Sequence, residues 1–368
     1  MNPIKTADLG NLEIISSPVL LVFPDRVEAN VNRMLEMVSG DVSRLRPHVK
    51  THKMAEVVQL QVAKGIIQFK CATIAEAEMT AESGGRDVLL AHQPVGPNLA
   101  RFQHLQERFP EVAFSATVDS AEVVSAFEET GKPARLFVDI DCGMHRTGVE
   151  PGEGALVLCR RIAKADNLDF AGLHAYDGHL HQSDLSERAE AHATAIESWA
   201  DLLQSLEREN LAPPTIVVGG SPTFGLFAPM ENWQCSPGTT LFWDAGYGHA
   251  FPDLEFEVAA MLLTRVISKP DGRLCLDLGH KAVAAERPID KRAWFPELPD
   301  AKPFLQSEEH FVVEAPNAGD FAVGDALLAV PWHVCPTVAL HAKAHLVRDG
   351  RVTPETWEVV ARNRSLTI

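Results

Sequence analysis

Short runs of β-forming residues alternate with segments of helical periodicity from about residue 44 to residue 243. This alternation is typical of parallel βα units, in which a helix follows each strand and covers the sheet. Eight strands are predicted, at 44–49, 66–72, 87–92, 111–118, 134–140, 168–176, 214–220 and 238–243. Units of this length close most economically as an α/β fold of the (β/α)8 TIM-barrel type, with its active site at the carboxyl ends of the strands.

The segments between these strands carry the end signals of helices. Residues 54–65 are amphipathic and end on Gly65, and residues 73–85 open with a capping box of Thr73 and Glu76. The longest helix is predicted at about 185–209, between the sixth and seventh strands. Apolar residues at helical spacing also predict a helix at 25–38, which follows a strand at 18–23, so that one βα pair precedes the barrel.

The pattern changes after about residue 248 to β-type runs separated by turns, with little helical period. A chain of 368 residues is long enough for a barrel and a smaller second domain. We therefore expect a barrel over residues 24–248 and a mostly β domain built from residues 1–23 together with 249–368.

Charge and cysteine content narrow the class of partner. The net charge of −17 argues against nucleic acid or an anionic membrane as the main partner, because both favour a basic face. The six cysteines form no CxxC pair, and no apolar run of about 18 residues occurs. These features predict a cytoplasmic protein.

Reactive side chains fall where a barrel site requires them. Lys50 ends the first predicted strand, where a desolvated amine could act as a nucleophile; the alternative is a solvated lysine beside two histidines and Lys53. Arg146 follows the fifth strand. Two loops rich in Gly, Ser and Thr, 217–224 and 236–240, adjoin the seventh and eighth strands and could cradle a phosphate through backbone N–H groups.

Two groups of histidines stand out. His174, Tyr176, His179 and His181 crowd the end of the sixth strand, which is more than packing alone requires. In the second domain, His333 and Cys335 lie two apart on a predicted strand, so both side chains would project from one face and could chelate Zn²⁺. The alternative for this pair is a buried histidine next to an inert buried cysteine.

Taken together, the motifs RPHVKTHK, DCGMHRTG, GLHAYDGH, GGSPTF, SPGTT and PWHVCPT resemble the family of D-threonine aldolases and eukaryotic-type D-serine dehydratases. The resemblance spans nearly the whole chain. It implies an alanine-racemase-like barrel with a C-terminal β domain, pyridoxal 5′-phosphate (PLP) and a divalent metal as cofactors, and a homodimer.

The resemblance also implies roles for individual residues. Lys50 would hold PLP as a Schiff base, and Arg146 would contact the phenolic oxygen of the cofactor. His174 and Tyr176 would line the cofactor, and His179 or His181 would be the catalytic base. The remaining roles are a phosphate cradle of Gly219, Gly220, Ser221, Gly238 and Thr239, and a Zn²⁺ or Mn²⁺ site of His333 and Cys335.

The choice among the family's reactions depends on a few positions. Racemisation is disfavoured because racemases of this fold use a tyrosine of the C-terminal domain, and no tyrosine follows Tyr247. Ser236, where alanine racemases carry an arginine, points the same way. His174 and His181 stand where the dehydratases compared carry tyrosines, which favours an aldolase that cleaves D-threonine to glycine and acetaldehyde.

Three alternatives remain open. Cys335 as second metal ligand is familiar from the dehydratases, so a D-serine or D-3-hydroxyaspartate dehydratase is the second hypothesis. A non-catalytic PLP-binding protein is a third, although the second domain with its histidine and cysteine pair argues against it. A structural or interaction protein is disfavoured, because several independent motifs fall at strand ends.

Overall fold

The computed structural model describes residues 4–368, and contacts between residues divide the chain into two compact units. One unit, here the barrel unit, comprises Met34–Lys50, Val58–Gly238 and Asn363–Ile368. The other, here the β unit, comprises the described part of Met1–Arg33 with Thr51–Val57 and Thr239–Arg362. Each unit is described by itself below.

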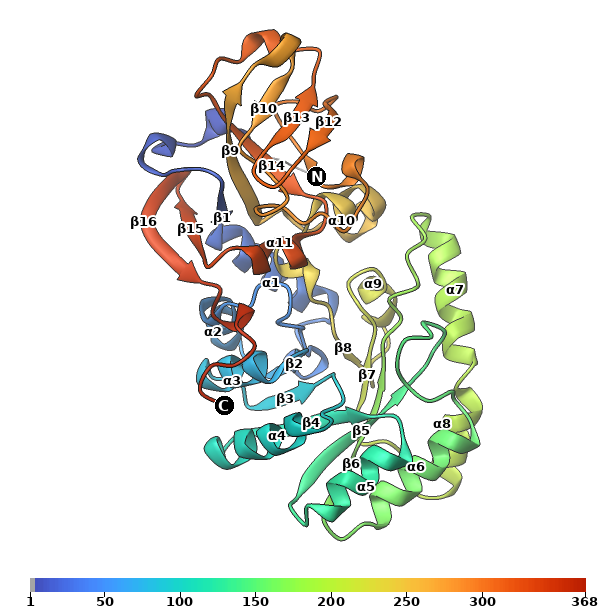
Figure 1. Cartoon of the computed structure of the whole chain (residues 1–368). Helices are drawn as coiled ribbons and strands as arrows, with labels where there is room; N and C mark the ends of the chain where they lie inside the picture. The colour runs from blue at the N-terminus through green and yellow to red at the C-terminus, as the bar shows by residue number, and fades with distance from the viewer. Residues whose placement is uncertain (1–3) are drawn as a thin grey trace. The chain divides into compact units, whose positions relative to one another are not determined.

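Seven parallel strands in consecutive order build the sheet of the barrel unit (Figure 1). They are β2 (Gln68–Cys71), β3 (Asp87–Leu90), β4 (Ala113–Val118), β5 (Ala134–Ile140), β6 (Leu168–Ala175), β7 (Ile216–Val218) and β8 (Gln234–Cys235). Strands β2 to β7 each fall within a predicted strand, and β8 lies outside the predicted ones. Parallel strands that alternate with helices confirm the expected α/β class.

The first predicted strand, at 44–49, is not a regular strand but joins the two edges of the sheet. Leu45 forms a parallel bridge with Cys235 of β8, and His48 forms one with Lys70 of β2. The N–H of Val49 donates to the carbonyl of Lys70 at 2.9 Å. Pro47 has no N–H to give to a ladder, which explains the irregularity. The segment still delivers Lys50 to the carboxyl end of the sheet.

The last predicted strand, at 238–243, is wrong. Residues Thr239–Leu241 form a 3₁₀ turn, and the backbone N–H of Trp243 donates back to the carbonyl of Thr239 at 2.6 Å. The run is buried and contains the β-branched and apolar residues that are also common in strands, which is why it resembled one. The parallel strand at this place is β8, a few residues earlier.

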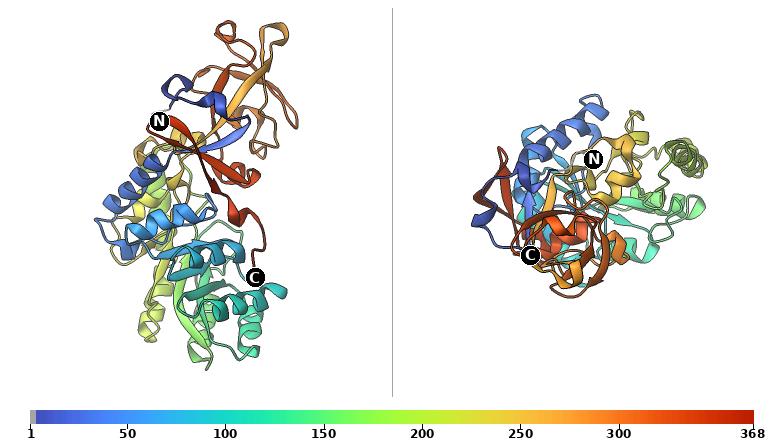
Figure 2. Two further views of the ribbon diagram at one scale, coloured as in Figure 1. Left: turned by 90° about the vertical axis from the view of Figure 1, so that its left-hand side faces the viewer. Right: turned by 90° about the horizontal axis from the view of Figure 1, so that it is seen from above.

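Helices lie on the outer side of the curled sheet in Figures 1 and 2. They are α3 (Ile74–Glu82), α4 (Pro97–Arg108), α5 (Ala121–Glu129), α6 (Glu153–Lys164), α7 (Leu185–Glu197), α8 (Ala200–Arg208) and the short α9 (Phe224–Phe227). The predicted helix at 185–209 is two helices, because Trp199 leaves helical geometry with its ring 5.1 Å from that of Trp233. Helices α1 (Pro24–Met37) and α2 (Ala55–Ala63) match the predicted early helices.

The β unit contains a mostly antiparallel sheet in the order β12-β13-β10-β9-β1-β15-β16, with β14 on β9 and β11 on β14. Its strands are β1 (Val19–Val22), β9 (Ala260–Ser268), β10 (Leu274–Leu276), β11 (Ala293–Trp294), β12 (Lys302–Gln306), β13 (Phe311–Glu314), β14 (Ala326–Pro331), β15 (Lys343–Arg348) and β16 (Arg351–Glu358). Two short helices, α10 (Ala245–Ala250) and α11 (Val334–Leu340), accompany it.

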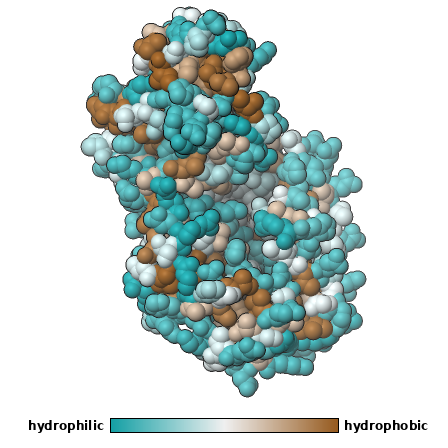
Figure 3. All heavy atoms as spheres, viewed as in Figure 1, coloured by the Kyte–Doolittle hydropathy of each residue, from teal (hydrophilic) through white to brown (hydrophobic). Residues whose placement is uncertain are grey.

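The strands of the barrel unit are buried along nearly their whole length. Leu89, Phe137, Ala171 and Val217 come from four different strands and form one buried cluster. Hydrophilic residues cover most of the face seen in Figure 3, with hydrophobic residues scattered among them. Among the described helices, none is both long and apolar enough to cross a bilayer.

Candidate active site

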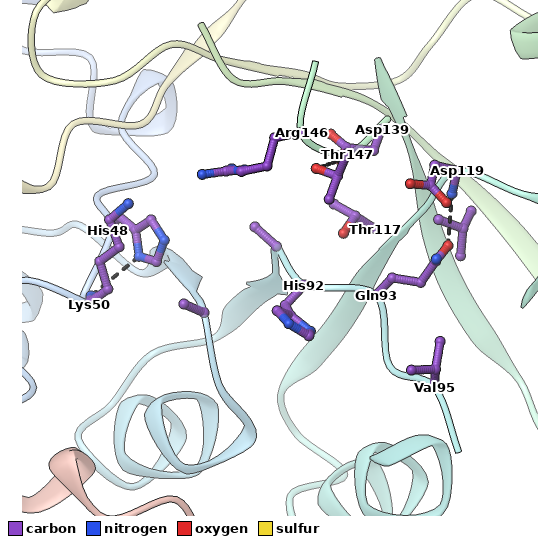
Figure 4. Close-up of a pocket in the computed structure, with 13 residues that line it drawn as sticks. His48, Lys50, His92, Gln93, Val95, Thr117, Asp119, Asp139, Arg146 and Thr147 are labelled. Carbon is purple, nitrogen blue, oxygen red and sulfur yellow. Dashed lines mark hydrogen bonds between the residues drawn. The ribbon is translucent and has the colours of Figure 1, made fainter. Parts of the chain in front are cut away.

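A cavity of about 520 Å³ opens in the barrel unit at the carboxyl ends of the first strands. Its wall includes His48, Lys50, His92, Asp139, Arg146 and Thr147, which come from segments far apart in the sequence. In Figure 4, Lys50 and His48 lie on one side, and the side chain of Arg146 reaches in from the wall that carries Asp139 and Thr147. The cavity lies where barrel enzymes bind their substrates.

Three basic side chains surround the ring of Tyr176. The Nζ atom of Lys50 is 5.3 Å from the ring centroid, and Cζ of Arg146 is 4.9 Å from it. The Nζ atom of Lys70 approaches the same ring at 5.6 Å. The structure therefore brings together Lys50, Arg146 and Tyr176, three of the residues predicted from sequence. Such a group of basic side chains favours an anionic ligand.

His174 is held between an acid and an amine. Its Nδ1 lies 2.6 Å from Oδ1 of Asp139, whose other oxygen accepts from the hydroxyl of Thr147 at 3.0 Å. Its Nε2 lies 3.5 Å from Nζ of Lys70. Burial lowers the pKa of His174 in spite of the Asp139 charge, so the imidazole is neutral near neutral pH.

Lys70 is a site residue that sequence reasoning missed. It lies on β2 and its side chain is buried, with only 2% of the residue exposed. Burial first, and the charge of Lys50 second, lower the pKa of Lys70 to about 7. The one signal in the sequence is a lysine inside the otherwise mainly apolar run IIQFKCA, which gives no indication of its partners.

The predicted phosphate cradle is partly brought together in the barrel unit. Ser221 Oγ accepts from the N–H of Gly238 at 3.2 Å, so the loops after β7 and β8 meet. Gly219 has φ of +73°, a conformation that favours glycine, and its N–H donates to the carbonyl of Ala175. A Cβ on Gly220 would lie 3.1 Å from the Tyr176 ring, so this loop approaches the ring closely.

Thr239 belongs to the β unit, where its hydroxyl is 3.7 Å from Sγ of Cys335.

The predicted bases lie on the loop after β6 and do not line the cavity of Figure 4. His179 is half-buried, and its Nδ1 has no hydrogen-bond partner among residues 4–368. Burial lowers the pKa of His179, so the ring is neutral and able to accept a proton near neutral pH. His181 is exposed, with Nδ1 2.6 Å from the carbonyl of His179. Nearby, burial raises the pKa of the Asp177 carboxyl to about 6.

His333 and Cys335 are not on a strand, which corrects the predicted geometry. Strand β14 ends at Pro331, His333 is the N-cap of α11 and Cys335 lies in its first turn. Pro336 suits this first turn, because its missing N–H has no helical partner there. The turn is held by Asp244, whose carboxylate accepts from the N–H of Val334 at 3.0 Å.

The donor chemistry of this pair fits a divalent metal. Nδ1 of His333 lies 2.6 Å from Oε1 of Glu286, which orients the ring, and the same imidazole makes a side-chain hydrogen bond with Cys335, so the two donor groups lie together. Cys335 Sγ lies 3.2 Å from the hydroxyl of Thr51. The described residues contain no cluster of three or more His, Cys, Asp or Glu side chains suited to a metal, so the pair supplies two ligands at most.

The sequence matches two known protein families. Residues 22–245 match the family described as "Alanine racemase, N-terminal domain", and residues 259–347 match "Putative serine dehydratase domain". The boundary between the two matches falls near the change in pattern that the sequence shows after residue 248.

Individual relatives cover almost the whole chain. D-threonine aldolase of Arthrobacter sp is 32% identical, over 95% of this chain and 94% of the relative. 3-Hydroxy-D-aspartate aldolase of Paracoccus denitrificans is 31% identical, over 95% and 93%. The crystal structure of D-threonine aldolase from Filomicrobium marinum superposes with a TM-score of 0.87 at 30% identity, over 96% and 98%. The chain therefore belongs to the family of PLP-dependent lyases that contains the D-threonine aldolases and the eukaryotic-type D-serine dehydratases.

Proposed function

We propose that this protein is a PLP- and metal-dependent aldolase that cleaves D-threonine and related D-β-hydroxy amino acids to glycine and an aldehyde. The observation that carries the proposal is that Lys50 and Arg146, which both line the cavity of the barrel unit, lie against the ring of Tyr176. The similarity to D-threonine aldolases and 3-hydroxy-D-aspartate aldolases supports the same reaction class.

The barrel unit fits PLP in charge and shape. Lys50 would carry the cofactor covalently, and Arg146 would donate to its phenolic oxygen. Tyr176 and His174 would line the cofactor. The loop of Gly219, Gly220 and Ser221, with Gly238, would receive the phosphate. When bound, PLP stabilises the negative charge that develops on the α-carbon of the amino acid.

Two ligands for a divalent metal would come from His333 and Cys335, with Glu286 orienting the imidazole. An imidazole and a thiol suit Zn²⁺, and Mn²⁺ is the second candidate. When bound, the ion would supply Lewis acidity, which lowers the pKa of a hydroxyl group near it.

The base would be His179 or His181, which takes the proton of the β-hydroxyl so that the bond between Cα and Cβ can break. His179 is the better placed to hold a proton, because its Nδ1 has no partner in the described chain. Substituting each histidine by glutamine, with cofactor loading checked by absorbance, tests the assignment. The base is the residue whose loss lowers kcat about 100-fold or more while PLP stays bound.

A substrate test separates the two main hypotheses. The purified protein, loaded with PLP and either Mn²⁺ or Zn²⁺, is incubated with D-threonine or D-serine, and glycine, acetaldehyde and pyruvate are measured. The aldolase gives glycine and acetaldehyde from D-threonine. Pyruvate from D-serine without glycine from D-threonine would overturn this assignment in favour of the dehydratase, which Cys335 as a ligand would also suit.

We also propose that the protein is a cytoplasmic homodimer. The family resemblance supports the dimer, and six cysteines without a CxxC pair suit a reducing compartment. Light scattering of the PLP-loaded protein tests the oligomeric state, and a monomeric mass would contradict the proposal.

A further inference from the structure

Lys70 is a second lysine in the barrel unit whose environment calls for a function. Its side chain is buried below the ring of Tyr176, and no carboxylate oxygen within residues 4–368 makes an ion pair with it. A buried ammonium without a direct counter-ion is unfavourable unless the amine is neutral or an anion binds nearby. Methionine or leucine would fill the same space without the free-energy cost of burying a charged group, so packing alone does not account for a lysine.

The contacts of Lys70 form a chain that reaches the wall of the cavity. Asp139 lies against Nδ1 of His174 at 2.6 Å, which makes Nδ1 the donor and leaves Nε2 as an acceptor in the neutral ring. Nζ of Lys70 lies 3.5 Å from this Nε2 and is therefore the donor of that contact. Asp139 itself lines the cavity, so the chain leads from a wall residue to the buried amine.

Charged groups face Lys70 from several segments. Lys50 and Arg146 add positive charge from the segment after Val49 and from the loop after β5. Asp139 on β5 and Asp177 after β6 add negative charge. With Lys70 protonated and His174 neutral, three cations face two carboxylates. An incoming anion would complete the balance of charge.

We propose that Lys70 is a positioning residue of the cofactor pocket, which takes up a proton as the anionic cofactor binds and thereby holds the cofactor beside Tyr176. The inference rests on the proposed binding of PLP at Lys50. The proton comes from solvent and resides on Nζ of Lys70, which donates to Nε2 of His174. In this arrangement Lys50 is the covalent attachment point, and Lys70 is an electrostatic partner.

The sign of the effect follows from the chemistry of a buried amine. The pKa of Lys70 is lowered to about 7, mainly by burial, and a bound anion raises it again because opposite charges favour the protonated form. The added affinity for PLP is therefore complete below about pH 7 and is lost as the pH rises through the pKa of the complex. Within that window the Lys70 contribution falls by up to about tenfold for each pH unit.

The test is isothermal titration calorimetry of PLP into the full-length apoprotein, in two buffers with different ionisation enthalpies. The difference gives the number of protons taken up on binding. The wild-type protein is expected to take up to about one proton more than Lys70→Met at about pH 8, because only the former has the titrating amine. Lys132→Met, which removes an exposed lysine of the barrel unit, is the matched control and should behave as wild type.

Lys70→Arg provides a second measure if Lys70→Met does not fold. Its guanidinium stays charged, so it should bind PLP without the extra proton uptake and with a flatter dependence of affinity on pH. Equal proton uptake by the wild type and both variants, with PLP bound in each, would overturn the inference about Lys70 alone. Failure of the wild-type protein to bind PLP would overturn the proposed function and this inference with it.

Discussion

Nδ1 of His174 lies 2.6 Å from Oδ1 of Asp139, and both residues are buried at the carboxyl ends of neighbouring strands β5 and β6. The carboxylate fixes which ring nitrogen carries the proton. Asp139→Asn would remove the charge and replace the charge-assisted hydrogen bond to the buried imidazole by a weaker one. We expect the free energy of unfolding in urea to fall by about 1–3 kcal/mol.

A control for this substitution lies on the neighbouring strand. Asp169 pairs at 3.6 Å with Arg135, but its side chain is 68% exposed. Asp169→Asn should change the free energy of unfolding by less than about 0.5 kcal/mol. If Asp139→Asn is equally mild, the pair with His174 does not stabilise the barrel unit.

Much of the position of this site could be predicted from sequence, because the βα pattern places strand ends and the barrel rule places reactive groups there. Arg146 follows one predicted strand, His174 and Tyr176 end another, and all three do lie at this end of the sheet. Lys70 could not be predicted, since its meaning depends on facing His174, which is 104 residues away. The hydrophobic pattern of a sequence predicts which residues are buried, but not which buried side chains contact each other.

The failures of detail share one physical cause. Residues 238–243 are buried, and the segment around His333 is buried in part, and short buried runs look alike whether they are strands, turns or helices. Length decides between them, and both runs are too short for a helical period to show. The pair of His333 and Cys335 was predicted as a chelating pair on a strand; it lies instead where a strand passes into α11.

The ion pair of Arg46 and Asp87 predicts a dependence of stability on pH. The guanidinium is 1% exposed and contacts both carboxylate oxygens, at 2.8 and 3.1 Å. Although burial acts to raise the pKa of Asp87, the charge and hydrogen bonds of Arg46 outweigh it and hold the pKa below its usual value. Asp87→Asn should destabilise the protein by about 3 kcal/mol at pH 7, because it leaves Arg46 buried and unpaired.

The pH profile separates this effect from lost packing. A carboxyl with a lowered pKa in the folded state stabilises fully above its unfolded value, near 4, and loses that contribution as the pH falls through the folded value. The difference between wild type and Asp87→Asn, measured by urea unfolding, should therefore be constant between about pH 5 and 7 and shrink below about pH 4. A difference that persists unchanged in acid would argue against the ion pair.

Gly172 predicts a severe effect of a single methyl group. It has φ of +137° at a register shift between β5 and β6, and a Cβ there would lie 1.8 Å from the carbonyl oxygen of Thr215. That oxygen accepts a hydrogen bond from the N–H of Leu173. Moving Thr215 away from Gly172 would therefore break this backbone hydrogen bond between β6 and the start of β7. Gly172→Ala should cost about 3 kcal/mol or more in thermal or urea unfolding. Gly319→Ala, where no heavy atom lies within 4 Å of the new Cβ and φ is not positive, is the matched control and should be nearly neutral.

Cys335 predicts which metal the proposed site prefers. A thiolate is a soft ligand that favours Zn²⁺, and a carboxylate favours harder ions such as Mn²⁺. Cys335→Asp should therefore lower the affinity for Zn²⁺ by about tenfold or more and weaken Mn²⁺ binding far less. Glu286→Gln, which keeps the size of the side chain that orients His333, should weaken the binding of both ions. Metal content after dialysis, with PLP absorbance as a check on the barrel unit, measures the outcome. Equal Zn²⁺ content in Cys335→Asp and wild type would exclude the thiol as a ligand.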